Sequence, residues 1–283
     1  MKLPYFDYRR ARTLDEAVAL MAALGSDAKA LAGGQSLLAT MRYRLARPEV
    51  LLDLNRIDEL RALPEAGPDG SVRLGAMCTH AMLAGLASSS PLAALLAAHA
   101  AEIAFPAVRT RGTVGGSLVH ADPAADWPLL LCALGAEVEL RSHRGVRRLP
   151  VQDFLLGPLE SDLAIDELLT HIHIPARTAA LRAWGRGKLM HRAGEFASSA
   201  AVVLRDADGA WACWLGAVPP KPVALTQSAA LLDGGMAPAS PELFDCASAE
   251  IRQLCPDAGR ADVHRHAVNL IRAAIAAQET VDV

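Results

Sequence analysis

Two short segments, each with a pair of adjacent glycines and a serine close behind, constrain this chain more than any other feature. They are Ala32-Gly33-Gly34-Gln35-Ser36 and Thr113-Val114-Gly115-Gly116-Ser117. Paired glycines allow a sharp turn and close approach of a ligand, so that successive N–H groups can surround phosphate oxygens. One such segment could be an ordinary turn between a strand and a helix. Two of them favour a ligand with two phosphates and a sugar-like chain, whose hydroxyls would donate to nearby carboxylates.

Neither glycine segment follows the G-x-G-x-x-G spacing of the dinucleotide fingerprint. A third stretch, Gly185-Arg186-Gly187-Lys188, lacks the upstream glycine and the following Ser or Thr of a P-loop. The sequence therefore does not support either of these two familiar nucleotide folds.

Apolar periodicity and turn signals predict alternating helices and strands up to about residue 175. Thr13 and Glu16 form a capping box, in which each side chain is expected to accept from the other residue's amide, and the helix ends at Gly25. We then expect strands at 29–31, 48–54, 71–76 and 168–175, a helix at 91–103 and a hairpin at 137–149. After a boundary near 175–183 we expect a hairpin of 200–205 with 211–218 and helices at 241–254 and 262–278.

The composition excludes several classes of protein. A length of 283 residues suggests about two domains, and a content of 52% hydrophobic residues excludes a disordered or collagen-like chain. The formal net charge of -3 gives no electrostatic reason to expect binding to nucleic acid or an anionic membrane. The best candidate for a spanning helix, 91–108, is interrupted by His99, Glu102 and Pro106, so we expect no membrane span.

The first ten residues lack the apolar core of a secretion signal, so we expect a cytoplasmic protein. The five cysteines are scattered and include no C-x-x-C pair. This pattern predicts reduced thiols rather than a disulfide framework, a zinc site or an iron–sulfur site.

Three ordered motifs resemble the FAD-binding medium subunit of molybdenum hydroxylases, the carbon monoxide dehydrogenase and xanthine dehydrogenase family. They are 32–38 with Met41, 44–48 and 52–54; 113–117 with 121–126; and 188–189 with 192–197. The resemblance implies an α+β fold. Residues 1–177 would form a two-subdomain FAD-binding domain of the vanillyl-alcohol oxidase / p-cresol methylhydroxylase type, divided at about 56/57. Residues 178–283 would form a small α+β domain with a three-stranded antiparallel sheet and helices.

The resemblance also implies which residues contact FAD. The backbones of Ala32, Gly33, Gly34, Gln35 and Ser36 would enclose the pyrophosphate, and Thr113, Gly116 and Ser117 would close it from the other side. Leu37, Gly115 and His120 would also bind the cofactor. Asp126 would contact the polar chain of the flavin nucleotide, and Leu169 and Lys188 would lie close to the isoalloxazine. A Cβ atom at Gly34 or Gly116 is expected to collide with the pyrophosphate. No Tyr follows Tyr43, so Trp184 and Phe196 are the two candidates to cover the flavin ring.

The function implied by the resemblance is electron transfer within a multi-subunit enzyme. FAD on this chain would receive electrons from 2Fe-2S clusters on a small subunit and pass them to an external acceptor, while a large molybdopterin subunit hydroxylates the substrate. The assembly would be a dimer of heterotrimers, and part of the apolar surplus would form its interfaces. The alternatives are a self-contained FAD-dependent reductase or oxidase of the same fold and a non-catalytic nucleotide-binding module.

Two pairs of histidines are weaker candidates. His171 and His173 project from the same face of a predicted strand, where they could bind a metal, but no third ligand is apparent and a solvated strand face explains them. His264 and His266 lie two apart on a predicted helix, point in different directions and are expected at the surface.

Two pairs of charged residues also have two interpretations. Asp126 could form an acid/base pair with Asp122, but its position before Pro128 favours a helix cap. Arg147 and Arg148 are interpreted as a charged strand edge, with docking of an acidic iron–sulfur partner as the alternative.

Overall fold

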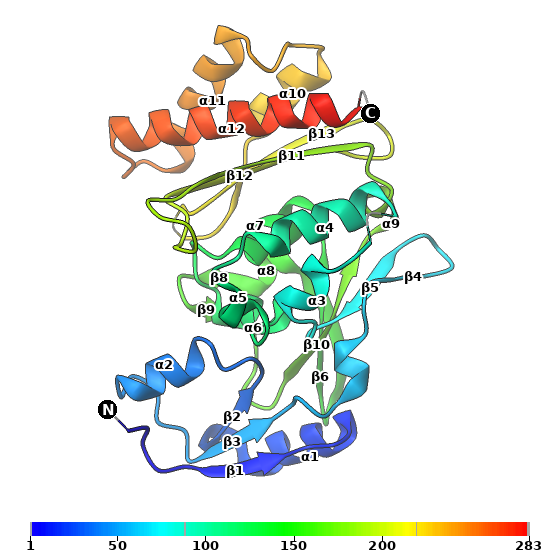
Figure 1. The fold of residues 1–283 in the computed structure, drawn as a ribbon, viewed down its shortest axis with the longest axis vertical. Helices are drawn as coiled ribbons and strands as arrows, with labels where there is room; N and C mark the ends of the chain where they lie inside the picture. The colour runs from blue at the N-terminus through cyan, green and yellow to red at the C-terminus, as the bar shows by residue number, and fades with distance from the viewer. Residues whose placement is uncertain (1, 88, 219, 282–283) are drawn as a thin grey trace.

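The computed structural model describes residues 2–281, apart from 88 and 219. Three parts follow one another along the longest axis of the molecule (Figure 1). A small N-terminal sheet lies at one end, a central five-stranded sheet with its helices lies in the middle, and a four-stranded sheet covered by helices lies at the other end. The predicted α+β fold class is confirmed.

The N-terminal part is a parallel sheet in the order β1-β3-β2, formed by β1 (Asp7–Arg10), β2 (Ala28–Leu31) and β3 (Val50–Asp53). Parallel neighbours require crossover connections, and these contain α1 (Leu14–Leu24), η1 (Gly25–Asp27) and α2 (Leu37–Arg42). The Thr13 side chain accepts from the Glu16 amide at 3.2 Å, as predicted. The Glu16 carboxylate, however, accepts from the amide of Arg12 at 2.8 Å, one residue before the expected partner.

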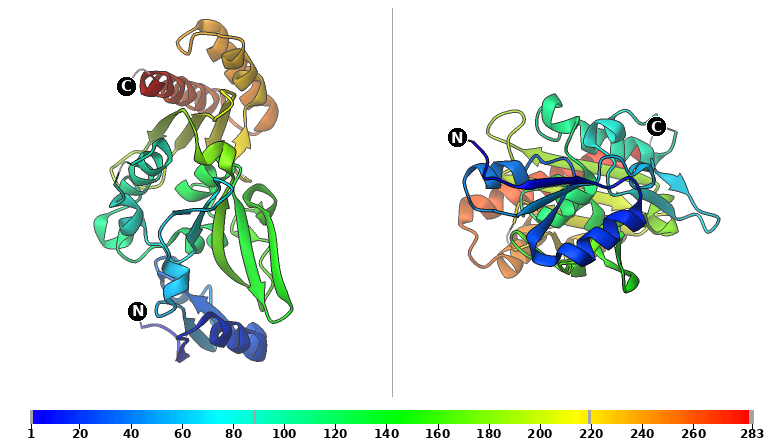
Figure 2. Two further views of the ribbon diagram at one scale, coloured as in Figure 1. Left: turned by 90° about the vertical axis from the view of Figure 1, so that its right-hand side faces the viewer. Right: turned by 90° about the horizontal axis from the view of Figure 1, so that it is seen from below.

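The central part is built on an antiparallel sheet in the order β4-β5-β10-β6-β7. Its strands are β4 (Glu65–Ala66), β5 (Val72–Gly75), β6 (Glu137–Ser142), β7 (Gly145–Pro150) and β10 (Leu168–Ile174), with a separate pair β8 (Leu155–Gly157) and β9 (Glu160–Ser161). Its helices are η2 (Asp58–Arg61), α3 (His80–Ala84), α4 (Pro91–Ala101), α5 (Pro106–Arg109), α6 (Val114–His120), α7 (Asp126–Ala133) and α8 (Val151–Phe154). The predicted hairpin at 137–149 and the strand at 168–175 are confirmed. Figure 2 shows the β6–β7 hairpin extending toward α1, where Arg141 pairs with Asp15.

The C-terminal part contains four antiparallel strands rather than the three expected. They are β11 (Ala183–Leu189), β12 (Ser199–Arg205), β13 (Trp211–Gly216) and β14 (Val223–Ala224), in that order. The two-residue β14 pairs along the edge of β13 and is too short to be recognised in the sequence. The helices are α9 (Ala176–Ala179), α10 (Thr226–Asp233), α11 (Pro241–Leu254) and α12 (Arg260–Val281), of which α10 was not predicted.

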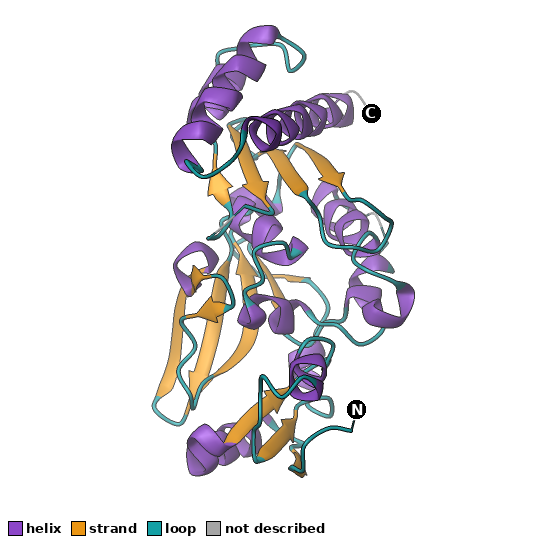
Figure 3. Cartoon of the chain, turned by 90° about the vertical axis from the view of Figure 1, so that its left-hand side faces the viewer, coloured by secondary structure: helices purple, strands orange, loops and turns teal. Residues whose placement is uncertain are grey.

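Strand β12 lies between two hydrophobic cores. Val202 and Leu204 pack with Trp127 and the central helices, whereas Val203 on the opposite face packs with the C-terminal helices. Figure 3 shows α12 on the side of this sheet that faces away from the central part. The C-terminal sheet therefore rests directly on the central part. No helix in the described part of the chain combines the length and the hydropathy needed to cross a membrane.

Candidate cofactor-binding site

A cavity of about 410 Å³ lies where the N-terminal and central parts meet. Both glycine segments line it, and so do His120, Asp126 and Leu169. Every residue that the sequence predicted to contact FAD lines this cavity except Lys188, which lies next to it. The structure thus brings together segments separated by about 80 residues in the sequence. Their contacts with FAD stay predictions.

The first glycine segment presents a row of unpaired amides. Within the described part of the chain, none of the N–H groups of residues 33–37 donates a hydrogen bond to the protein. Gly34 has a φ of 72°, a backbone conformation that favours glycine. The helix α2 begins directly afterwards and adds the positive end of its dipole. Such a row of amides is suited to bind an anionic group.

The second glycine segment is the first turn of α6 rather than an open loop. Thr113 is its N-cap, and its hydroxyl accepts from the Gly116 amide at 3.1 Å. The Gly115 amide donates to Ala76 O at 2.8 Å, and the Ser117 amide donates to Thr113 O at 3.1 Å. These three amides are therefore occupied within the protein. This segment still lines the cavity with the Ser117 hydroxyl and with two glycines that leave space for a ligand.

Protein atoms limit the space at Gly33, Gly34 and Gly116, and the expected collision of a Cβ with the pyrophosphate stays a prediction. A Cβ at Gly33 would lie 2.1 Å from Arg111 O, so the two glycine regions touch through their backbones. A Cβ at Gly34 would meet the side chains of Leu31 and Leu38 at 3.2 Å, and one at Gly116 would meet Thr113 Oγ1 at 2.8 Å. The nearest obstacles to side chains at Gly34 and Gly116 are thus protein atoms.

Asp126 forms a buried ion pair instead of the predicted helix cap. It is the first residue of α7, whose N-cap is Ala125, and its Oδ1 lies 2.7 Å from the Nζ of Lys188 on β11. Burial raises the pKa of the Asp126 carboxyl despite the neighbouring ammonium. Asp126 lines the cavity, so this pair joins the cavity wall to the C-terminal sheet.

Of the two aromatic residues considered as covers for a flavin ring, Phe196 lines the cavity. It is 64% exposed and lies in the connection between β11 and β12. Trp184 instead packs against the central hydrophobic core. The geometry therefore favours Phe196 for this role.

Two residues at or near the cavity were not predicted from the sequence to belong to the site. The His80 ring lines the cavity, and its Nδ1 accepts from Trp127 Nε1 at 3.0 Å. Burial lowers the pKa of His80 to about 4, so the ring is neutral at pH 7. Asn55, which follows β3, donates from Nδ2 to the carbonyl of Ala32 at 3.0 Å. Both contacts join residues that are far apart along the chain.

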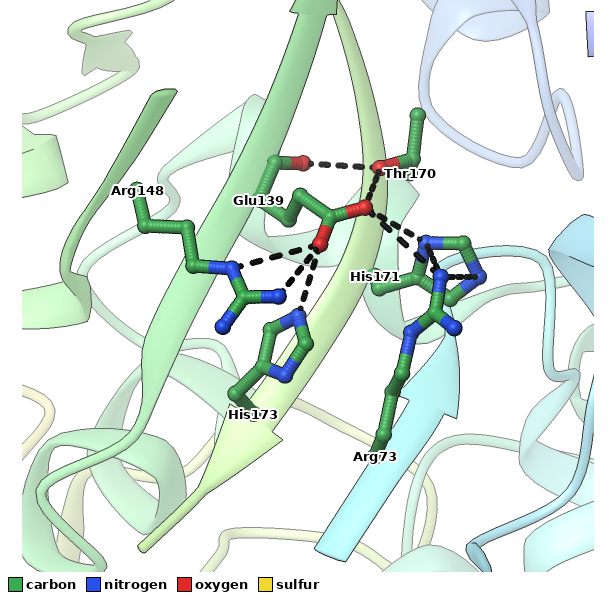
Figure 4. Close-up of polar contacts among 6 residues, drawn as sticks. All are labelled: Arg73, Glu139, Arg148, Thr170, His171 and His173. Atoms are coloured by element: carbon green, nitrogen blue, oxygen red, sulfur yellow. Dashed lines mark hydrogen bonds and ion pairs between the residues drawn. The ribbon is translucent and has the colours of Figure 1, made fainter. Parts of the chain in front are cut away.

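His171 and His173 do face the same way, and they share the carboxylate of Glu139 (Figure 4). His171 Nδ1 and His173 Nε2 each lie 3.0 Å from a Glu139 oxygen, and the Thr170 hydroxyl donates to it at 2.9 Å. The side chains of Arg73 and Arg148 approach the same carboxylate. Their positive charges disfavour a cation, and no cluster among the described residues could hold a metal ion.

Other charged residues also have partners within the chain. Arg147 pairs with Glu167 and Asp162, and Arg148 pairs with Glu139, which favours the charged strand edge over docking of a partner. His264 is exposed, as expected. The expectation for His266 was wrong, because it is buried and its Nδ1 lies 2.9 Å from Ser199 Oγ on β12.

Comparisons with known proteins agree with this geometry. Residues 4–177 match the family described as the FAD binding domain in molybdopterin dehydrogenase. The chain is 41% identical over 209 residues to the nicotine 6-hydroxylase medium subunit of Paenarthrobacter nicotinovorans, covering 74% of this chain and 72% of that one. It is 41% identical over 203 residues to the carbon monoxide dehydrogenase medium chain of Hydrogenophaga pseudoflava, covering 71% and 70%.

A solved structure extends the similarity to the whole chain. Carbon monoxide dehydrogenase from Hydrogenophaga pseudoflava, in a form that lacks the Mo-pyranopterin moiety, contains a chain that superposes with a TM-score of 0.87. The sequence identity is 34%, and the alignment covers 99% of both chains. The likeness therefore includes the C-terminal part, which the family match leaves uncovered.

Proposed function

The chain belongs to the family of FAD-binding domains of molybdopterin dehydrogenases, and from that membership we propose a role in electron transfer. It is the FAD-binding medium subunit of an oxidoreductase of the molybdenum hydroxylase class. In the proposed role it holds FAD where electrons arrive from the 2Fe-2S clusters of a small partner subunit and leave to an external acceptor. The organic substrate would be hydroxylated at the molybdopterin of a large subunit, in a dimer of heterotrimers.

The observation that carries this proposal is the row of unpaired amides at 33–37 on the wall of the cavity. Buried or half-buried N–H groups without a partner are unfavourable, and a pyrophosphate would satisfy several of them at once. The hydroxyls of Ser36 and Ser117 line the same cavity and can donate further hydrogen bonds. The donor set therefore fits the phosphates of FAD.

The remaining residues position the cofactor and need no acid or base chemistry. When bound, FAD supplies the electron chemistry itself. The buried pair of Asp126 and Lys188 fixes the cavity wall against the C-terminal sheet, and Phe196 offers a ring at the exposed side. Neutral His80 keeps a positive charge out of the wall beside Trp127. The protein thus provides binding, orientation and a fixed electrostatic environment.

A measurement of flavin content tests this function. We expect the chain, purified with its partners, to show the visible spectrum of FAD at one per chain. The variant Gly33→Ala should lose most of its bound FAD, because the added Cβ would lie 2.1 Å from Arg111 O and force the two glycine regions apart. Gly85→Ala is the matched control, since its Cβ would make only ordinary contacts at 3.5 Å. A wild-type complex without FAD would contradict the proposal.

A further inference from the structure

The peptide groups of the first glycine segment are used in an asymmetric way. Residues 33–37 line the cavity, and within the described part of the chain their N–H groups have no protein partner, whereas four successive carbonyls accept hydrogen bonds within the chain. These carbonyls belong to Leu31, Ala32, Gly33 and Gly34, and their donors are Leu54 N, Asn55 Nδ2, Gln35 Nε2 and Leu38 N. The orientation of each peptide group is therefore set from its carbonyl side.

One of these contacts reaches the segment through a side chain from a neighbouring strand end. Asn55 Nδ2 donates to Ala32 O at 3.0 Å and to Asp53 Oδ1 at 2.6 Å. The Asn55 backbone amide donates to the same Asp53 oxygen at 2.9 Å. With both of its Nδ2 protons directed at acceptors, the Asn55 side chain has one favourable orientation.

Asp53 is itself firmly held. Its side chain is 5% exposed, and its Oδ2 accepts from the Tyr8 hydroxyl and, at 3.0 Å, from Arg10 Nε. Burial would raise the pKa of Asp53, but hydrogen bonds from Tyr8 and Asn55 outweigh it and lower the pKa. The carboxylate therefore stays charged at neutral pH and remains a fixed acceptor for Asn55.

We propose that Asp53 and Asn55 are positioning residues that hold the Ala32–Gly33 peptide group with its N–H directed at the FAD pyrophosphate. The carbonyl of Ala32 and the amide of Gly33 belong to one planar unit, so that fixing the oxygen fixes the N–H. This inference rests on the proposed function, because it assigns the ligand of the row of amides.

Without the Asn55 donor, this peptide group is free to rotate. The rotation changes ψ of Ala32 and φ of Gly33, and glycine tolerates a wider range of φ than any other residue. The rotation removes one N–H from the row and turns a carbonyl oxygen toward the phosphates, where the two negative ends repel. Affinity should decrease for ligands that carry the pyrophosphate and stay unchanged for ligands that lack it.

The test compares the affinities of the deflavinated full chain for FAD and for riboflavin, which has no phosphate. In Asn55→Ala we expect FAD to bind at least about tenfold more weakly, with riboflavin affinity unchanged. Asn269→Ala is the matched control, because Asn269 also donates from a buried side chain to a carbonyl, that of Gly187 at 3.1 Å. Its ratio of FAD to riboflavin affinity should equal that of the wild type.

A second variant keeps the test decisive if Asn55→Ala fails to fold. In Asn55→Asp the side chain can donate to Ala32 O only when protonated, so FAD affinity relative to wild type should recover as the pH falls from about 7 toward about 4, near the ordinary pKa of an Asp carboxyl. The proposal would be overturned if Asn55→Ala bound FAD as tightly as the wild type, or if it lost affinity for FAD and for riboflavin equally. It would also be overturned if the FAD affinity of Asn55→Asp did not recover in acid. A wild-type chain that binds no FAD would instead contradict the proposed function.

Discussion

Glu139 is a single carboxylate that holds together the polar face of the central sheet. It lies on β6 and accepts from Thr170, His171 and His173 on the adjacent β10. Burial alone would raise the pKa of Glu139, but these hydrogen bonds lower it to about 2. Because the pKa of Glu139 in the folded chain lies below its ordinary value of 4.5, the carboxylate stabilises the fold at pH values above about 4.5.

We expect Glu139→Gln to lower the free energy of unfolding by about 2 kcal/mol at pH 7. This value allows for solvent screening, because the arginines around Glu139 are about half exposed. The difference from wild type should shrink as pH falls from the unfolded value toward the folded pKa of about 2. Urea unfolding at a series of pH values measures this difference in the free energy of unfolding. Glu137→Gln, an exposed position on the same strand, is the control. A difference that does not change between neutral and acidic pH would contradict the expectation.

Strand β11 shows how one element serves two neighbours. Successive residues of a strand point to opposite faces. Gly185 and Gly187 face α12, where an added Cβ would lie 1.9 Å from Ala273 O and 2.4 Å from Asn269 Oδ1. Arg186 and Lys188 pair with Glu102 at 2.8 Å and Asp126 at 2.7 Å in the central part. The strand thus brings a helix close on one side and charged groups to the cavity on the other.

The close approach of α12 makes Gly185 a sensitive position. We expect Gly185→Ala to destabilise the chain by about 2–4 kcal/mol, because the collision is with helix backbone and not with a side chain that can move. Thermal unfolding measures this. Gly234→Ala, where the added Cβ would lie 3.4 Å from Leu231 O, should change stability little. Equal stabilities of the two variants would show that α12 does not pack as described.

The molecule as a whole exposes several large apolar side chains. Tyr43 and Leu45, which follow α2, are 69% and 80% exposed, and Leu159 and Phe196 at the cavity are 61% and 64% exposed. Single exposed apolar residues are common, but a subunit clamped between partners must also expose apolar surface before assembly. The apolar surplus of the composition is consistent with such a role.

We therefore expect the isolated chain to self-associate. Replacing Tyr43 and Leu45 together by Ser should reduce this association and weaken binding to the partner subunits, because apolar contact area is lost. Sedimentation velocity of the chain alone and with its partners measures both effects. Leu63→Ser, at an exposed position after η2, is the control. A wild-type chain that remains a monomer would contradict this expectation.

Local sequence alone determined the positions of most helices and strands, because apolar periodicity and caps act between residues a few positions apart. Helix α11 begins and ends where the pattern placed it, at Pro241 and Leu254. Helix α10 was missed because its first amides are capped from outside, by Glu250 on α11. The two glycine segments and the family resemblance were also visible in the sequence, and together they predicted FAD as the cofactor.

The tertiary structure alone decided how these residues are used. It showed that the amides at 33–37 are unpaired whereas those of Gly115 and Gly116 are occupied. It also replaced the predicted cap at Asp126 by an ion pair with Lys188. Hydrogen-bond and charge partners depend on strand register and on the packing of distant segments. A local pattern contains neither, so which donors remain free for a ligand follows only from the folded chain.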